Sequence, residues 1–303
     1  MLLAEQVLNG AEFGIMLFLL AAGLTLVFGI MGLINLAHGS LYMIGAFAAA
    51  WAGNATGSFL MALLTGMGAA AVIGMAVEAL VLRRLYARDH LDQVVATFGL
   101  ILFFNEAATM LFGRQPLFAR MPPWLGGSVE LLPGVPYPAY RLAIIAVGLL
   151  VALGLYLLVA RTRLGMLIRA GNSDREMVRA LGVDIGLIYT LVFGLGALLA
   201  GLAGVMAGPV FSVQVGMGEQ VLILTFVVII IGGIGSVRGA FVGALLVGMV
   251  DTLTRAFLPG LLKLVLSTSD ADAVGNGVSS MAVYLLMAAV LLWRPRGLFP
   301  AHG

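Results

Sequence analysis

Residues 33–41 read LINLAHGSL, and this stretch is a polar interruption in the middle of a long apolar run. Residues 13–77 contain no Asp, Glu, Lys or Arg, yet Asn35, His38 and Ser40 stand near the centre of the run. A charge-free run of this length is typical of membrane-buried helices, in which an unsatisfied polar group costs several kcal/mol. The stretch therefore predicts a break between two such helices, with three hydrogen-bonding side chains at the break.

The composition of the whole chain indicates a membrane protein. The chain has 303 residues, of which 62% are hydrophobic and 10% charged, and its mean hydropathy is +1.11. Soluble domains carry about 25% charged residues. Barrel strands would alternate apolar and polar residues, whereas these runs are apolar on every side. We expect a single all-α, polytopic transmembrane domain over residues 1–303, with spans near 12–31, 40–53, 58–82, 94–113, 141–160, 186–208, 220–234, 237–257 and 278–293.

The basic residues predict how the chain is threaded through the membrane. They cluster in residues 83–90, 161–184 and 293–297, and basic loops favour the cytoplasmic side. This places the N-terminus outside and the C-terminus in the cytoplasm, with residues 113–140 and 267–277 as external loops. Because no Lys or Arg precedes Arg83, the first apolar stretch lacks the basic start of a signal peptide and is expected to be retained.

Several classes of function have no signal in the sequence. The net charge of +2 is spread between spans, so we expect no binding of nucleic acid. There is no cysteine, and the three histidines are far apart, so no metal site and no cofactor are expected. The phosphate-binding motif GxxxxGK[ST] is absent, and Lys263 is the only lysine. Active transport would therefore need ATP hydrolysis by another chain.

Two interruptions of apolar runs are candidates for a substrate pathway. A polar break at membrane depth is expected where it lines a water-filled cavity, although LINLAHGSL could equally be a short cytoplasmic loop or a polar packing cluster. The glycine-rich residues 229–245 form a second interruption, and paired interruptions are typical of transporter sites. The predicted pathway residues are Asn35, His38, Gly39, Ser40, Gly232, Gly233, Gly235 and Ser236.

Three acids lie within or beside the spans. Such acids are candidates for proton or ion coupling. Glu78 has Arg83 close by in sequence, and Asp251 has Arg255 four residues later, so each can form an ion pair. Glu106 has no basic neighbour, and a buried hydrogen bond is the first expectation for it.

The longest charged segment, residues 161–184, contains the sequence NSDREMVRALG. It predicts a short helix capped by Asn172 or Ser173, ended by Gly182, and with an apolar stripe that includes Met177 and Leu181. Such a helix could rest on lipid headgroups or dock into a groove on a partner.

Three blocks carry a resemblance to a known family: residues 23–49, 161–206 and 230–253. Together they resemble the branched-chain amino-acid ABC transporter permeases of the LivH type, over nearly the whole chain. The resemblance implies a bacterial inner-membrane importer with a second related permease or a second copy of this chain, two cytoplasmic ATPases and a periplasmic substrate-binding protein. It also implies ATPase coupling through the charged segment, for which we name Arg169, Asn172, Arg175, Glu176, Arg179, Leu181 and Gly182.

Other functions stay open on the residues alone. The same family includes permeases for urea and amides. A secondary transporter driven by protons or ions would need Glu106 or Asp251 at its site. An intramembrane enzyme would have to use His38 with an acid or with Ser40, and spacing alone supplies no such geometry.

Overall fold

The computed structural model describes residues 2–132, 134–173 and 175–299. The helices are α1 (Leu2–Met31), α2 (His38–Thr56), α3 (Phe59–Leu80), α4 (His90–Phe112), α5 (Ala139–Arg161), α6 (Arg163–Ser173), α7 (Arg175–Ala180), α8 (Ile185–Ala207), α9 (Met217–Gly232), α10 (Val237–Leu262) and α11 (Thr268–Trp293). The 3-10 turns η1 (Leu82–Arg84) and η2 (Pro123–Leu125) and the strands β1 (Ser128–Leu132) and β2 (Val135–Pro138) complete the elements.

The all-α, multi-pass architecture is confirmed. Seven of the described helices are long and apolar enough to cross a membrane, and each of the nine expected spans coincides with a helix. The two shorter segments, α2 and α9, have 19 and 16 residues. At 1.5 Å per residue, α9 is only about 24 Å long, which is less than the thickness of the hydrocarbon core.

Two helices begin earlier than the sequence predicted. Helix α1 starts at Leu2 rather than near residue 12, and α11 starts at Thr268 rather than near residue 278. Residues 267–277, expected as an external loop, are therefore the N-cap and about the first three turns of α11. There the Ser267 side chain accepts a hydrogen bond from the Asp270 backbone N–H, and an acid in the first turn favours the helix dipole.

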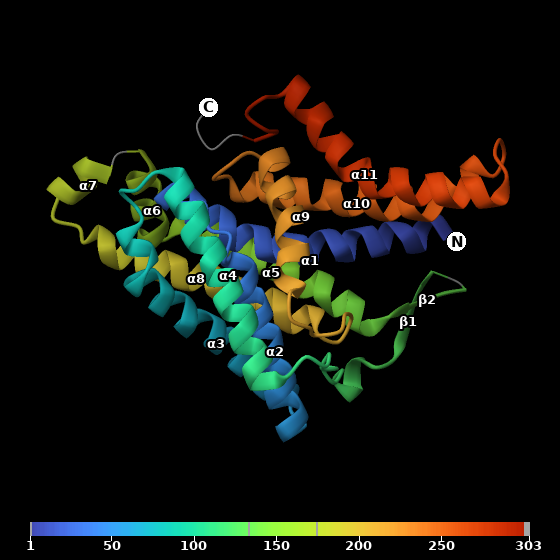
Figure 1. Ribbon diagram of the computed structural model, residues 1–303, viewed down its shortest axis with the longest axis horizontal. Coiled ribbons are helices and arrows are strands. Elements are labelled where there is room, and N and C mark those ends of the chain that lie inside the picture. Colours follow the sequence, from blue (N-terminus) through green and yellow to red (C-terminus); the bar gives the residue numbers. More distant parts are fainter. Residues whose placement is uncertain (1, 133, 174, 300–303) are drawn as a thin grey trace.

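Helix α1 is the axis of the bundle. In its most apolar 18-residue window 83% of the residues are buried, against 61% for α8 and 17–28% for the other long helices. In Figure 1, α1 runs through the middle of the molecule, with α10 and α11 along one side and α2, α3 and α4 crossing at an angle on the other. A helix that is apolar all round is suited to this enclosed place.

Small residues permit close packing around this axis. A side chain on Gly23 would lie 2.6 Å from the Gly196 carbonyl oxygen of α8, and one on Gly14 would lie 2.8 Å from the Ala244 oxygen of α10. Gly45 of α2 meets Gly201 of α8 in the same way. These small residues thus let helices of this one chain pack closely.

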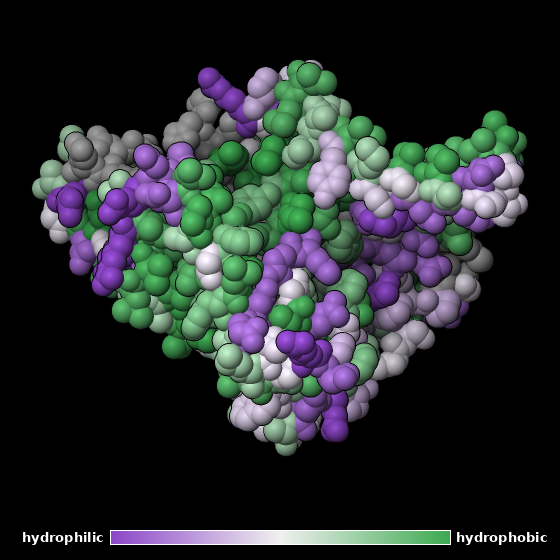
Figure 2. Space-filling view, viewed as in Figure 1, coloured by the Kyte–Doolittle hydropathy of each residue, from purple (hydrophilic) through white to green (hydrophobic). Residues whose placement is uncertain are grey.

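The described part of the connection between α4 and α5 contains a hairpin that the sequence analysis did not predict. Strands β1 and β2 pair antiparallel, and Leu117 pairs with Val213 in the connection between α8 and α9. Figure 2 shows hydrophobic residues covering the face over α3, and hydrophilic residues gathered near the N-terminal end of α1. The apolar faces are suited to lipid or to another membrane subunit.

Candidate functional site

The polar interruption LINLAHGSL is a helix break. Gly32 ends α1 with a positive φ of 63°, and its N–H donates to the Phe28 carbonyl at 2.9 Å. The Asn35 side-chain oxygen then accepts from the Ala37 N–H at 3.1 Å, a local turn that leads into α2 at His38. One glycine and one asparagine therefore explain why the helix stops and restarts here.

The break lies inside the bundle. A Cβ atom on Gly23 would be 3.1 Å from His38 Nε2, whereas α1 continues to Met31. Eight residues of helix correspond to about 12 Å, so α2 starts well inward of the end of α1. Asn35 is 1% exposed, His38 0% and Ser40 4%. The three side chains are therefore enclosed by protein, although the break starts at the basic end of the bundle, where the Ile34 N–H donates to Gln93 Oε1 at 3.4 Å.

The first turn of α9 meets the first turn of α2. Gly39 and Gly218 touch backbone to backbone, and a Cβ on Gly39 would lie 2.5 Å from the Gly218 carbonyl oxygen. Helix α9 itself starts after Gly216, whose φ is 86°. Two helix N-termini, each with a partial positive charge, are thus brought together within the protein. Broken helices whose N-termini meet inside a bundle are typical of transporter binding sites.

Buried polar atoms beside this crossing have no partner. Among the described residues nothing forms a hydrogen bond with either ring nitrogen of His38, with Asn35 Nδ2 or with Thr25 Oγ1. An unsatisfied buried polar group costs about 1–3 kcal/mol, so a cluster of such groups calls for an occupant or a function.

A carboxylate that the sequence analysis missed stands next to the crossing. Glu219, in the first turn of α9, accepts a hydrogen bond from Asn105 Nδ2 of α4 at 2.5 Å, and its Oε2 has no partner among the described residues. The signal was present, because Glu219 is the only charged residue in the span 185–237. Glu106 is exposed, so the buried hydrogen bond expected for it is wrong; its neighbour Asn105 makes the contact instead.

The second predicted interruption lies at another level of α1. Gly233 and Gly235 have φ values of 106° and 81° and form the tight turn between α9 and α10. A Cβ on Gly29 would be 3.2 Å from Gly235 Cα, so this turn is six residues, or about 9 Å, along α1 from Gly23. The Ser236 side chain accepts from the Gly239 N–H and caps α10, and Gly232 packs on Gly239. The structure therefore does not bring the two interruptions together at one level of the bundle.

The charged segment forms two helices rather than one. Asn172 and Ser173 belong to the last turn of α6, which begins at Arg163. The side chains of residues 172–176, and with them the predicted cap, Arg175 and Glu176, lie outside the part of the chain that is described. Gly182, with a φ of 81°, follows α7 as predicted.

The exposed and buried sides of α7 differ from the expected stripe. Val178 is the buried residue, at 5% exposure, while Leu181 is 75% exposed; Arg169 of α6 and Arg179 are also exposed. Leu181 is therefore a surface residue and does not belong to the core of the bundle.

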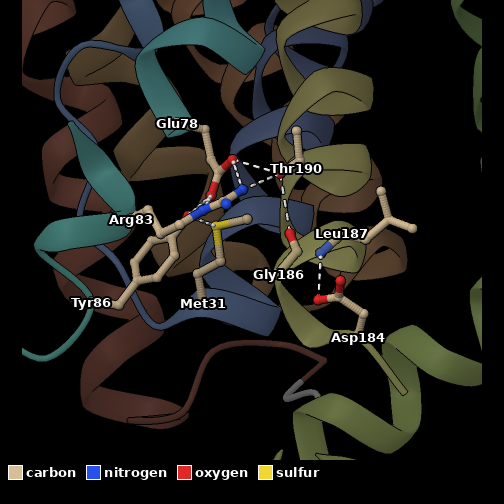
Figure 3. A network of polar contacts seen from close by, with 8 residues as sticks. All are labelled: Met31, Glu78, Arg83, Tyr86, Asp184, Gly186, Leu187 and Thr190. Atoms are coloured by element: carbon tan, nitrogen blue, oxygen red, sulfur yellow. Dashed lines mark hydrogen bonds and ion pairs between the residues drawn. The ribbon is translucent and has the colours of Figure 1, made fainter. Parts of the chain in front are cut away.

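A polar network connects this segment to the core (Figure 3). Glu78 of α3 is fully buried and accepts from Arg83, Tyr86 and Thr190 at 3.0, 2.8 and 2.7 Å. Burial and the Glu78 carboxylate raise the pKa of Tyr86 well above its usual value, so the phenol stays protonated and donates. Asp184 caps the same end of α8, accepting from Leu187 at 3.2 Å.

Both ion pairs suggested by sequence spacing are confirmed. Arg83 and Glu78 approach to 3.0 Å, and Arg255 and Asp251 to 2.9 Å. Asp251 is therefore already paired within α10.

Comparison with known proteins agrees with this architecture. The model of the family described as branched-chain amino acid transport system, permease component, matches residues 6–292. The chain belongs to this family. It is 30% identical to the high-affinity branched-chain amino acid transport permease BraD of Pseudomonas aeruginosa, over 97% of this chain and 94% of BraD.

Other relatives are similar over shorter or equal lengths. Identity to the permease LivH of Escherichia coli is 28%, over 96% of each chain. The ribose import permease RbsC of Escherichia coli is 29% identical over 77% of this chain and 72% of RbsC. No solved structure matches.

Proposed function

We propose that this chain is the membrane-spanning permease subunit of an ABC importer that carries branched-chain or related amino acids across the bacterial inner membrane. The observation that carries the proposal is the meeting of the α2 and α9 N-termini inside the bundle, beside buried polar atoms without partners. The similarity to BraD and LivH over nearly the full chain supports the class of solute.

The chemistry of the crossing is suited to a zwitterion. Helix N-termini favour a carboxylate, and Glu219 offers a negative charge to an ammonium group one residue from the Gly39–Gly218 contact. The apolar Leu222 is buried beside Gly39 and is suited to an aliphatic side chain. An amino acid with an apolar side chain has these three features together.

The energy for import would come from partner subunits. In this proposal two cytoplasmic ATPases grip the α6–α7 segment, a periplasmic binding protein delivers the solute to the face that carries the β1–β2 hairpin, and a second permease or a second copy completes the pathway. The Glu78 network supports such coupling, because it joins α3 to Thr190 in the second turn of α8, six residues after the charged segment ends at residue 184.

The secondary-transporter alternative has less support. Asp251 is paired with Arg255, and Glu106 is exposed on α4. An ion-coupling site needs an acid that changes partner during transport. Transport by this chain alone in proteoliposomes, without ATP, would favour that alternative over the importer.

The test is uptake by a complex reconstituted from this chain, a second permease or a second copy of this chain, two ATPases and a substrate-binding protein. We expect ATP-dependent uptake of radiolabelled leucine, reduced at least about tenfold by Glu219→Gln, because an amide no longer pairs with the ammonium. Glu106→Gln is the matched control and should retain uptake. Uptake of urea or ribose in place of leucine would overturn the assignment of the solute.

Cysteine reactivity tests the pathway independently. The chain has no native cysteine, so Asn35→Cys, His38→Cys and Ser40→Cys give a clean background. If these residues line the pathway, reaction with a small water-soluble thiol reagent should change between ATP-bound and nucleotide-free states. Reactivity that is the same in every state, or absent in all, would contradict the pathway.

A further inference from the structure

A crevice opens on the outside of the bundle at the basic end of the molecule. Its volume is about 900 Å³, and it lies between α5, α6 and α10, with α1 behind it and the residues after α11 at its edge. Its inner walls are apolar and include Phe18 of α1, Leu155 of α5 and Phe241 of α10. An open apolar crevice at membrane depth is filled by hydrocarbon or by another membrane segment, since water is excluded there.

Among the described residues that line the crevice, the charged ones are two arginines. Arg169 of α6 and Arg238 of α10 line it and are exposed. Arg169 donates to the Val159 carbonyl, and the Arg238 guanidinium lies 5.3 Å from the centre of the Tyr156 ring. Among the described residues neither arginine forms an ion pair, whereas Arg83, Arg141 and Arg255 all do.

These arginines lie where headgroups are found. Arg169 contacts the last turn of α5, which ends at Arg161, and Arg238 is in the first turn of α10. The ends of apolar helices next to a basic loop lie at the level of the phosphates, and the long arginine side chains reach that layer. Fixed positive charge at the mouth and apolar walls inside are complementary to an anionic amphiphile.

We propose that this crevice binds an anionic phospholipid, with the phosphate between Arg169 and Arg238 and an acyl chain along Leu155, Val159 and Phe241. A helix of a second permease is the competing occupant. It would cover two arginines that have no acidic partner here, and burying unpaired charge is costly. A lipid phosphate neutralises both charges with charge-assisted hydrogen bonds. The proposal does not depend on the solute.

The experiment measures lipid binding to the purified full chain in detergent. Phosphatidylglycerol and phosphatidylcholine with identical acyl chains are titrated, and binding is followed by native mass spectrometry and by the rise in Tm. We expect phosphatidylglycerol to bind at least about tenfold tighter than phosphatidylcholine, and Arg238→Gln to remove most of that preference. Arg84→Gln, an exposed arginine on η1 that does not line the crevice, should retain it.

A second variant separates the acyl-chain site from general charge. Leu155→Trp fills space at the apolar wall and leaves both arginines in place, so it should weaken the binding of phosphatidylglycerol. Inorganic phosphate alone should raise the Tm of neither the unaltered protein nor the Leu155→Trp variant. Equal binding of the two lipids, or an unchanged preference in Arg238→Gln, would overturn the proposal. Disulfide formation between two chains carrying Phe241→Cys, in lipid membranes, would assign the crevice to a permease partner instead.

Discussion

At the scale of single residues, the structure separates polar groups that stabilise the fold from polar groups left for function. Both carboxylate oxygens of Glu78 accept hydrogen bonds, and the donors are Arg83, Tyr86 and Thr190. His38 and Asn35 are equally buried, yet atoms of both have no hydrogen-bond partner among the described residues. Because burial is the same, the difference in partners marks the second group as the one with capacity to bind.

Substituting Glu78 tests the stabilising role. In Glu78→Ala, Arg83 loses its counter-charge, and Tyr86 and Thr190 lose an acceptor, so we expect the free energy of unfolding to fall by about 2 kcal/mol. This loss of stability is smaller than the roughly 3–5 kcal/mol expected for a fully buried ion pair, because the Arg83 side chain is 46% exposed and water can solvate it. Thermal unfolding in detergent measures the change.

Asp251→Ala is the matched control for Glu78→Ala. Its partner Arg255 is 54% exposed, and such pairs contribute at most about 1 kcal/mol. If Glu78→Ala and Asp251→Ala lower the free energy of unfolding equally, the buried network stabilises the fold no more than an exposed ion pair does.

At the scale of elements, close backbone contact decides how the helices meet. Helices α2 and α9 cross at Gly39 and Gly218, where even one methyl group has no room. Ser40, Leu41 and Leu222 are placed by this crossing. The spacing of the two N-termini, and with it the candidate site, depends on these two glycines.

Adding a methyl group at the crossing should therefore impair transport more than it impairs insertion. Gly39→Ala and Gly218→Ala each force the two backbones apart, with an overpacking cost of about 1–3 kcal/mol. We expect leucine uptake to be lost while the protein still reaches the membrane. Gly154→Ala is the control, because nothing lies within 4 Å of a Cβ atom there. Normal uptake by Gly39→Ala would show that the crossing tolerates displacement.

The second element to test is α7. Leu181 is 75% exposed at the end of this short helix, and we expect it to enter a groove on the ATPase. Leu181→Glu should abolish co-purification of the ATPase and solute-stimulated ATP hydrolysis while the permease remains folded. Leu264→Glu, at a leucine that is 82% exposed after α10, is the control at the opposite end. Unchanged co-purification would leave α6 and α7 as helices that rest on headgroups.

At the scale of the whole molecule, contacts gather at two ends. Tyr86 meets Met31, Arg83 meets Thr190, and the Leu298 N–H donates to the Ile231 carbonyl at one end, which carries the three basic clusters. At the other end Tyr137 donates to Asn9 at 3.1 Å and Asn54 donates to the Phe118 carbonyl at 3.2 Å. Chain segments far apart in sequence thus define two opposite faces.

Reporter fusions test which face is cytoplasmic. We expect the N-terminus and the loop at residues 113–140 to report outside, and fusions after Arg88 and Arg296 to report inside, because basic loops are retained in the cytoplasm. A cytoplasmic signal from the N-terminus, with an external signal after Arg88, would invert the whole threading.

The sequence by itself determined the class of fold and the positions of the helices. Charge-free runs of about 20 residues can only be membrane segments, and Gly32 and Asn35 determined where α1 ends and α2 begins. The two ion pairs followed from spacing along single segments, as did the glycine turn after α7. The starts of α1 and α11 were missed, because polar first turns extend beyond the apolar runs that mark a span.

Only the tertiary structure decided which residues come together. Hydropathy shows that a segment is buried, but it does not show at which level of another helix the segment packs. It therefore could not show that Gly39 contacts Gly218, or that Gly235 packs against Gly29 of α1. The partnership of Asn105 with Glu219, 114 residues apart, was likewise invisible. The physical reason is that helix crossings are determined by side-chain packing summed over several helices, and no local pattern in one helix encodes its partner.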